Sequence, residues 1–227
     1  MAVNSNLNAF FVEFGFKTAK SRIVMSTLSC PLALQKLFRK YIYASSTPIQ
    51  SFELSVQDQT FAEAAYVPLL STESMEMVLS DSAMTRVEKT DFIRNNPLTP
   101  KYLDVCWAEQ LASSNCRDDR WLKGKTKKNC GWCDKCLRTL FTLELLGEDL
   151  SQYDSIFDLQ KYQVHKNGFI KTVILNRQKN HLYSEIYDLM LTTGFCVPRS
   201  VILSLNRYRL KQKARQLFRF LSFQKKG

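Results

Sequence analysis

The stretch Asn129-Cys-Gly-Trp-Cys-Asp-Lys-Cys136 holds three of the chain's seven cysteines, in Cys-x2-Cys-x2-Cys spacing. A strongly helix-prone run, Leu137–Leu146, follows directly. Three thiols cannot all pair as disulfides, but they can converge on one metal ion when a fourth ligand comes from elsewhere in the chain. Gly131 lets the backbone bend tightly beside that ion. The stretch therefore predicts a metal site at the start of a helix.

Two other cysteines qualify as the fourth ligand. Cys106 lies at the end of Leu103–Trp107, which we interpret as a short strand, and a strand end is a rigid position from which to deliver a ligand. Cys116 is closer to the triplet in sequence but lies in a polar loop. We prefer Cys106, and Cys116 is the alternative.

Zinc is the metal that this spacing favours, because four thiolates suit its tetrahedral coordination. An iron–sulfur cluster is the competing cofactor, since ferredoxin-type ligation begins with the same spacing. Such runs usually continue to a fourth cysteine followed by proline, whereas Leu137 follows Cys136 here. Three reduced thiols without any metal are the third interpretation.

The composition is that of a folded protein rather than a disordered chain. The chain has 227 residues, of which 45% are hydrophobic, enough for one large domain or for one domain with an appendage. It has no apolar run of membrane-spanning length, and its first residues lack the order of a secretory signal. We therefore expect a cytoplasmic protein, whose clustered cysteines bind metal rather than form disulfides.

The net charge of +11 is concentrated at the C-terminal end. Residues 161–227 contain fourteen Lys or Arg and two acids, a balance of +12, which leaves about −1 for residues 1–160. This asymmetry predicts an α/β domain over residues 1–150 that carries the metal site, and a basic, mainly helical extension over residues 151–227.

Hydrophobic periodicity and turn signals give a coarse order of elements. They predict a loop over residues 49–66 and leave the segment 75–79 undecided. The predicted helices lie in 28–38, 86–93, 134–147, 183–191 and 199–223, and the predicted strands in 41–44 and 103–107. This alternation of helices and strands in the first 150 residues favours a sheet with parallel strands.

Two segments of the chain, Leu103-Asp-Val-Cys-Trp107 and Asn129–Leu140, resemble the C-terminal half of 7-cyano-7-deazaguanine synthase-like proteins. These belong to the PP-loop (adenine nucleotide α-hydrolase-like) ATP pyrophosphatases. The resemblance covers roughly residues 1–148. It implies part of a Rossmann-like (HUP-type) parallel sheet with a zinc-clasped helix, and a structural zinc bound by Cys106, Cys130, Cys133 and Cys136.

The chain departs from that family at the element that binds ATP. The family holds the phosphates with a Ser-Gly-Gly-x-Asp-Ser loop, and such a cradle needs glycines so that the backbone can approach the anion. No two of the chain's seven glycines are adjacent. We therefore expect a chain truncated on its N-terminal side and inactive alone. ATP and magnesium would bind only if a separate PP-loop chain supplied the missing loop. The completed protein would then be an ATP-dependent ligase or amidating enzyme of the PP-loop type.

Four residues are weak candidates for nucleotide or anion binding: Ser71, Glu73, Arg86 and Lys89. Arg86 and Lys89 are three apart in a predicted helix, so they can face the same anion. The alternative is an ordinary solvated helix face.

The basic C-terminal helix suggests a second kind of partner. Clustered Lys and Arg neutralise phosphates, so Arg207, Lys211 and Arg215 are candidate contacts to nucleic acid. A basic amphipathic helix can equally lie on an anionic membrane surface or bind a protein partner. The simplest alternative is a helix that packs on the core through its Leu and Phe side chains.

Overall fold

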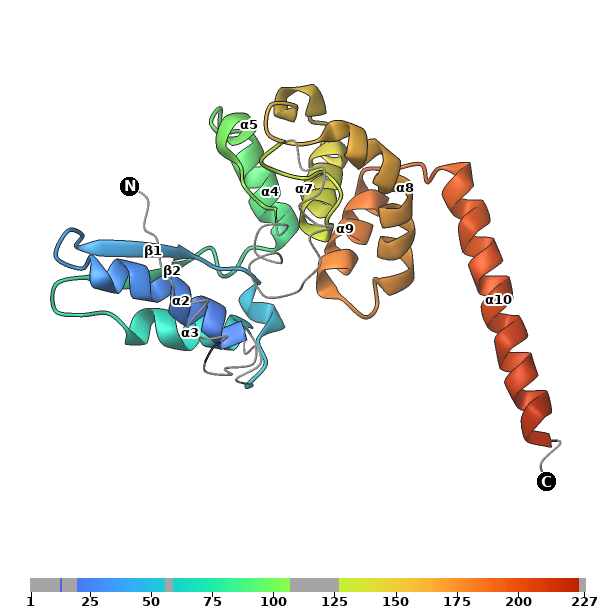
Figure 1. Cartoon of the computed structure of the whole chain (residues 1–227), viewed down its shortest axis with the longest axis horizontal. Helices are drawn as coiled ribbons and strands as arrows, with labels where there is room; N and C mark the ends of the chain where they lie inside the picture. The colour runs from blue at the N-terminus through green and yellow to red at the C-terminus, as the bar shows by residue number, and fades with distance from the viewer. Residues whose placement is uncertain (1–12, 14–19, 56–58, 107–126, 225–227) are drawn as a thin grey trace. The chain divides into compact units, whose positions relative to one another are not determined.

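The computed structural model describes residues 13, 20–55, 59–106 and 127–224 (Figure 1). The chain is an α/β protein in which helices outweigh a small parallel sheet. It forms two compact units. The described residues of unit 1 lie between 13 and 95, and those of unit 2 are 96–106 and 127–224.

Unit 1 is built on two parallel strands. Strand β1 (Lys40–Ala44) pairs with β2 (Glu76–Ser80), and Ile42 lies opposite Val78 in the register. Parallel neighbours need a crossover, and helix α3 (Gln59–Leu69) supplies it here. Helix α2 (Lys20–Ala33) packs against α3. The strand predicted at 41–44 is confirmed, and the undecided segment at 75–79 is a strand.

The core of unit 1 is small. Its fully or almost fully buried side chains come from both helices, both strands and the loop before β2: Val24, Leu28, Tyr43, Ala62, Val67, Met75 and Met77. Side chains alternate along β1, so Tyr43 is buried while its neighbour Ile42 keeps 62% of its surface exposed. The helices therefore cover one face of this sheet.

The loop predicted over residues 49–66 is wrong for much of its length. Helix α3 begins at Gln59, after a short 3-10 turn, η1 (Ile49–Ser51). Two polar residues of α3, Thr60 and Glu63, are buried with its apolar ones. Because these buried polar residues interrupt the helical spacing of hydrophobic residues, that spacing does not predict α3 from the sequence.

Helix α4 (Arg86–Arg94) confirms the helix predicted at 86–93. It begins with a capping box, in which the Thr85 hydroxyl accepts from the Glu88 backbone N–H at 3.2 Å. In return, the Glu88 carboxylate accepts from the Thr85 backbone N–H at 2.7 Å. This reciprocal pair satisfies two donors that helix ends otherwise leave unpaired.

Unit 2 is helical. Its elements are α5 (Thr99–Tyr102), α7 (Asp134–Leu145), η3 (Leu150–Tyr153), α8 (Leu159–Asn176), α9 (His181–Thr192) and α10 (Arg199–Gln224). Helix α7 contacts η3, α8 and α9, and α10 packs on α8. The buried Phe141 of α7 makes edge-on contacts with Phe169 and Phe195. The helices predicted at 134–147, 183–191 and 199–223 are confirmed to within a few residues.

Three sequence predictions differ from the structure of unit 2. Helix α8 was not predicted as a separate element, although residues 151–227 were expected to be mainly helical. The boundary expected at residue 150 does not divide compact units, because α7 packs against α8 and α9 across it. The described part of the strand predicted at 103–107, Leu103–Cys106, is not a strand. The backbone N–H groups of Val105 and Cys106 donate to the side chain of Asn129 instead of to a neighbouring strand.

Among the described side chains of helix α10, the buried ones lie near its start. Val201 and Leu205 are buried, whereas every residue from Asn206 to Lys211 is exposed. A helix packed on the core along its length, the simplest interpretation of its sequence, is therefore wrong for these residues. Within the described parts of the chain, no helix combines the length and the apolar character needed to span a membrane.

Candidate metal centre

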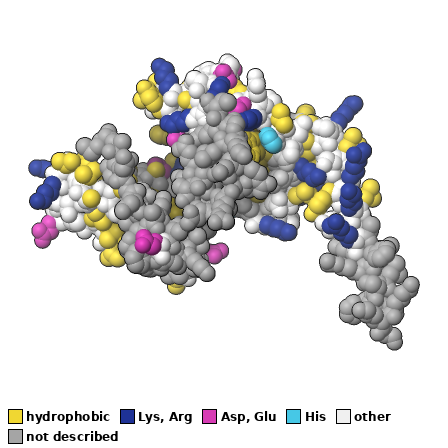
Figure 2. All heavy atoms as spheres, in the orientation of Figure 1, with side chains coloured by type: hydrophobic (Ala, Val, Ile, Leu, Met, Phe, Trp, Pro, Cys, Tyr) yellow, Lys and Arg dark blue, Asp and Glu magenta, His cyan; other side chains and the backbone are white. Residues whose placement is uncertain are grey.

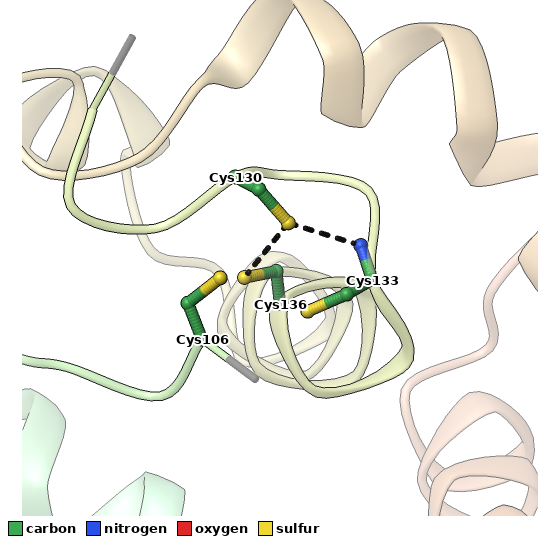
Figure 3. A group of neighbouring side chains, drawn as sticks. All are labelled: Cys106, Cys130, Cys133 and Cys136. Carbon is green, nitrogen blue, oxygen red and sulfur yellow. Dashed lines mark hydrogen bonds between the residues drawn. The ribbon is translucent and has the colours of Figure 1, made fainter. Parts of the chain in front are cut away.

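Four cysteines of unit 2 converge on one point (Figure 3). Cys130 lies in the loop before α7, Cys133 is the N-cap of that helix, and Cys136 lies in its first turn. Cys106 comes from the segment that follows α5. The four sulfur atoms all lie within 4.8 Å of one another. The structure thus brings Cys106, the preferred fourth ligand, to the triplet, while Cys116 lies outside the described residues.

The side chain of Asn129 holds the segment of Cys106 in place. Its Oδ1 accepts from the backbone N–H groups of Val105 at 2.9 Å and Cys106 at 3.1 Å. Its Nδ2 donates to the carbonyls of Leu103 at 2.8 Å and Ile156 at 3.3 Å. Asn129 is fully buried, so these four bonds satisfy an amide that water cannot reach.

The backbone of Asn129 ties the loop to a third segment. Its N–H donates to the Ile156 carbonyl at 2.8 Å, and its carbonyl accepts from the Asp158 N–H at 3.1 Å. Residues Asn129 and Phe157 thus form an isolated parallel bridge. The cysteine spacing predicts no role for Asn129. The sequence feature that could have indicated one is its position immediately before the first cysteine of the triplet.

Gly131 is required by the close approach of this third segment. Its φ is +77°, in the region that favours glycine. A Cβ atom there would lie 2.0 Å from the backbone oxygen of Asp158. The tight bend predicted at this glycine is confirmed, and the structure adds that the residue must also lack a side chain.

The sulfur geometry suits a tetrahedral thiolate site. With metal–sulfur bonds of about 2.3 Å, tetrahedral zinc places its sulfurs roughly 3.8 Å apart. The Cys130 and Cys136 sulfurs are 3.9 Å apart. The Cys133 backbone N–H donates to the Cys130 sulfur at 3.3 Å, a bond that stabilises a thiolate. Cys130, Cys133 and Cys136 are buried and Cys106 is half-buried, so the cluster can hold a metal ion largely shielded from water.

Two thiols of the cluster, those of Cys130 and Cys136, are hard to ionise without a metal. The hydrogen bond with the Cys133 side chain is the largest cause that raises the pKa of the Cys130 thiol, and with burial it outweighs the lowering by the Cys133 backbone N–H, so that the pKa is about 11. The pKa of Cys136 is also raised, first by its hydrogen bonds with Cys130 and Cys133 and then by burial. A metal ion must therefore displace protons from these sulfurs, so its binding strengthens as the pH rises.

The four weak anion candidates lie in unit 1, and two of them have internal roles. The Ser71 hydroxyl accepts from the Met77 N–H at 2.9 Å, next to β2. The Lys89 ammonium donates to the carbonyl of Ser45 at 2.7 Å and to its hydroxyl at 2.5 Å. The side chains of Arg86 and Glu73 are exposed. Arg86 and Lys89 both lie on α4, as predicted, but nothing in the structure tests anion binding by any of the four.

The nucleic-acid candidates Arg207, Lys211 and Arg215 are all exposed on α10. Figure 2 shows Lys and Arg side chains following one another along the described start of this helix. Lys171 of α8 lies against it, donating to the Ser204 hydroxyl at 2.8 Å and lying 5.6 Å from the centre of the Tyr208 ring.

The chain was compared with protein-family models, with curated proteins and with solved structures, and none of the three comparisons finds a match.

Proposed function

We propose that this chain is a zinc-binding protein in which Cys106, Cys130, Cys133 and Cys136 hold one structural zinc ion. The observation that carries the proposal is the convergence of four sulfur atoms within 4.8 Å. Four protein thiolates leave no open position on a tetrahedral ion, which is the mark of a structural rather than a catalytic site. The ion would clasp the Cys106 segment to the start of α7.

Metal analysis of single-cysteine variants tests this assignment. We expect one zinc ion per chain in the natural protein, and its loss or marked weakening in Cys106→Ser and in Cys133→Ser. Cys30→Ser is the matched control, because Cys30 is a half-buried cysteine of helix α2 in unit 1. Cys116→Ser tests the alternative ligand and should keep its zinc. Bound iron with acid-labile sulfide, or full zinc occupancy in Cys106→Ser, would overturn the assignment.

We further propose that residues 1–150 correspond to the C-terminal part of a 7-cyano-7-deazaguanine synthase-like ATP pyrophosphatase with a Rossmann-like sheet. Two features support this proposal: the parallel pairing of β1 with β2, and the four-cysteine cluster beside α7. The described helices cover one face of the sheet and leave the other uncovered. Because parallel sheets are usually buried on both faces, the uncovered face fits a separate PP-loop chain as partner. Ile42 on the other face is 62% exposed.

Pyrophosphate release from ATP and magnesium tests that second proposal. We expect none from the purified zinc-loaded chain, because its sequence contains no Ser-Gly-Gly loop. Activity should appear when a PP-loop chain from a neighbouring reading frame is co-expressed with it. Release by the chain alone, at a rate typical of an enzyme, would contradict the proposal without affecting the zinc assignment.

Nucleic-acid binding through α10 is a second candidate function. The observation that favours it is the exposure of Arg207, Lys211 and Arg215 on a helix with seven basic residues and no acid. Changing these three residues to Gln should weaken binding to a single-stranded oligonucleotide and reduce the salt slope by about 2 to 3. The matched control changes Lys36, Arg39 and Lys101 to Gln, which are exposed cations that do not belong to α10. Equal losses in both triple variants would reject α10 as the binding surface.

A further inference from the structure

The turn between α8 and α9 contains an open depression of about 580 Å³. Its lining includes Arg177, Lys179, His181, Ser184, Tyr187 and Asp188. The lining is only slightly more polar than apolar, and two of its residues carry fixed positive charge. None of the four cysteines lines this depression, and none of the functions proposed above uses it.

Arg177 is held in position by its neighbours. Its guanidinium group lies 4.7 Å from the centre of the Tyr187 ring, within the range of a cation–π interaction. Its Nη1 donates to the carbonyl of Ile174 at 2.6 Å. A guanidinium group has five N–H donors in a rigid fork, so one bond leaves others for an anion. Because the fork is already fixed, little side-chain entropy is lost when an anion binds.

The other two basic side chains are exposed. Lys179 and His181 carry no side-chain hydrogen bond or ion pair in the described structure, so both can turn toward a ligand. The Ser184 hydroxyl is half-buried in the same lining and can donate as well. Asp188 lowers the charge of the lining: Arg177 and Lys179 give +2 and Asp188 gives −1, so the sum is +1 with His181 neutral.

The first turn of α9 offers few free backbone donors. The Asn180 side chain already accepts from the Leu182 N–H at 2.9 Å, and the Asn180 carbonyl accepts from Tyr183 and Ser184. Recognition of an anion here therefore depends on the side chains rather than on the helix end. An arginine fork beside a lysine and a histidine matches the several oxygen atoms of a phosphate group.

We propose that this depression binds a phosphate group, with Arg177 and Lys179 as its main contacts and His181 and Ser184 as additional donors. The shared chemistry is that of a phosphate monoester or of a phosphodiester in a nucleic-acid backbone. Either source presents oxygen acceptors that protrude far enough to enter a depression as open as this one.

Titration calorimetry on the full zinc-loaded chain tests the site with three probes: inorganic phosphate, adenosine monophosphate and a short oligothymidylate. The test variant is Arg177→Gln with Lys179→Gln. The matched control is Lys36→Gln with Arg39→Gln, which removes one lysine and one arginine from exposed positions in unit 1. Since Arg177 packs on Tyr187, a second test variant, Lys179→Gln with His181→Gln, alters exposed side chains only.

We expect saturable phosphate binding that is at least about tenfold weaker in the first test variant, measurably weaker in the second and unchanged in the control. Tighter binding of adenosine monophosphate than of phosphate, lost in the test variants, identifies a monoester ligand. Weakened oligothymidylate binding in the test variants identifies a phosphodiester. The absence of saturable phosphate binding, or an equal loss in the control, overturns the proposal whatever the outcome of the zinc and α10 experiments.

Discussion

Asn129 shows how a residue that is not a ligand can position a metal site. Its buried amide joins the Cys106 segment to the loop of the triplet and to Ile156. Because each buried polar group must find a partner, the amide fixes the distance between ligands that are 24 residues or more apart in sequence, from Cys106 to Cys130.

Asn129→Ala should lower the free energy of unfolding by about 3 kcal/mol, since it leaves the half-buried N–H groups of Val105 and Cys106 without an acceptor. It should also weaken zinc binding, because Cys106 loses its support. Denaturant unfolding and a zinc competition assay measure the two effects. Asn176→Ala is the control, since the Asn176 amide makes one bond, to the Thr172 carbonyl. Similar losses in both variants would contradict the role given to Asn129.

Gly131→Ala adds only one methyl group, but it should disturb both the stability of the protein and its zinc site. The added Cβ would lie 2.0 Å from the Asp158 oxygen, at a backbone φ of +77° that alanine rarely adopts. The loop must therefore shift, and zinc content should fall together with the melting temperature. Gly168→Ala is the control, because a Cβ at Gly168, inside α8, meets no atom within 4 Å. A stable, zinc-loaded Gly131→Ala protein would show that the segment at Asp158 can move aside.

At the scale of elements, caps define where helices begin. Cys133 occupies the N-cap position of α7, without a capping hydrogen bond from its side chain, and belongs to the metal cluster, so the start of that helix and the site are one feature. Helix α4 begins instead with the reciprocal pair of Thr85 and Glu88. The two hydrogen bonds from Thr85 lower the pKa of the Glu88 carboxyl. A lowered pKa in the folded state stabilises the protein above the unfolded pKa of Glu, and this contribution is lost as the pH falls through the folded pKa.

Thr85→Ala should therefore destabilise the protein by about 1 kcal/mol at neutral pH. The difference from the natural protein should be smaller at a second pH well below the ordinary pKa of Glu, because the contribution of the ionised Glu88 carboxylate is lost as the pH falls through its lowered pKa. Denaturant unfolding at the two pH values measures both effects. Thr90→Ala is the control, since the Thr90 hydroxyl only bonds back to the Arg86 carbonyl within the same helix. A loss that is independent of pH would show that Glu88 takes no part in the cap.

At the scale of the whole molecule, the two units have different sources of stability. Unit 1 depends on a small apolar core around β1 and β2, whereas unit 2 combines packed helices with the cysteine cluster. Removal of zinc with a strong chelator should therefore act on unit 2. Amide resonances of residues 127–136 should shift or broaden, while those of the unit 1 core, such as Val24 and Met77, should stay unchanged. Equal perturbation of both cores would mean that the units unfold together.

The sequence alone determined the features that are local in the chain. The spacing of Cys130, Cys133 and Cys136, the helix after them and the α4 helix all depend on residues within a few positions of one another. Backbone geometry alone relates such residues, so a pattern in the sequence can predict them. The excess of basic residues toward the C-terminus is read directly from the sequence.

Only the tertiary structure decided the features that join distant segments. It pairs β1 with β2 in parallel, brings Cys106 to the triplet through Asn129, and leaves residues 206–211 of α10 exposed. It also shows α3 and α8 as helices, one with buried polar residues and one with charged residues among its apolar ones. The physical reason is that burial and long-range hydrogen bonding depend on which segments meet, and no single stretch of sequence contains that information.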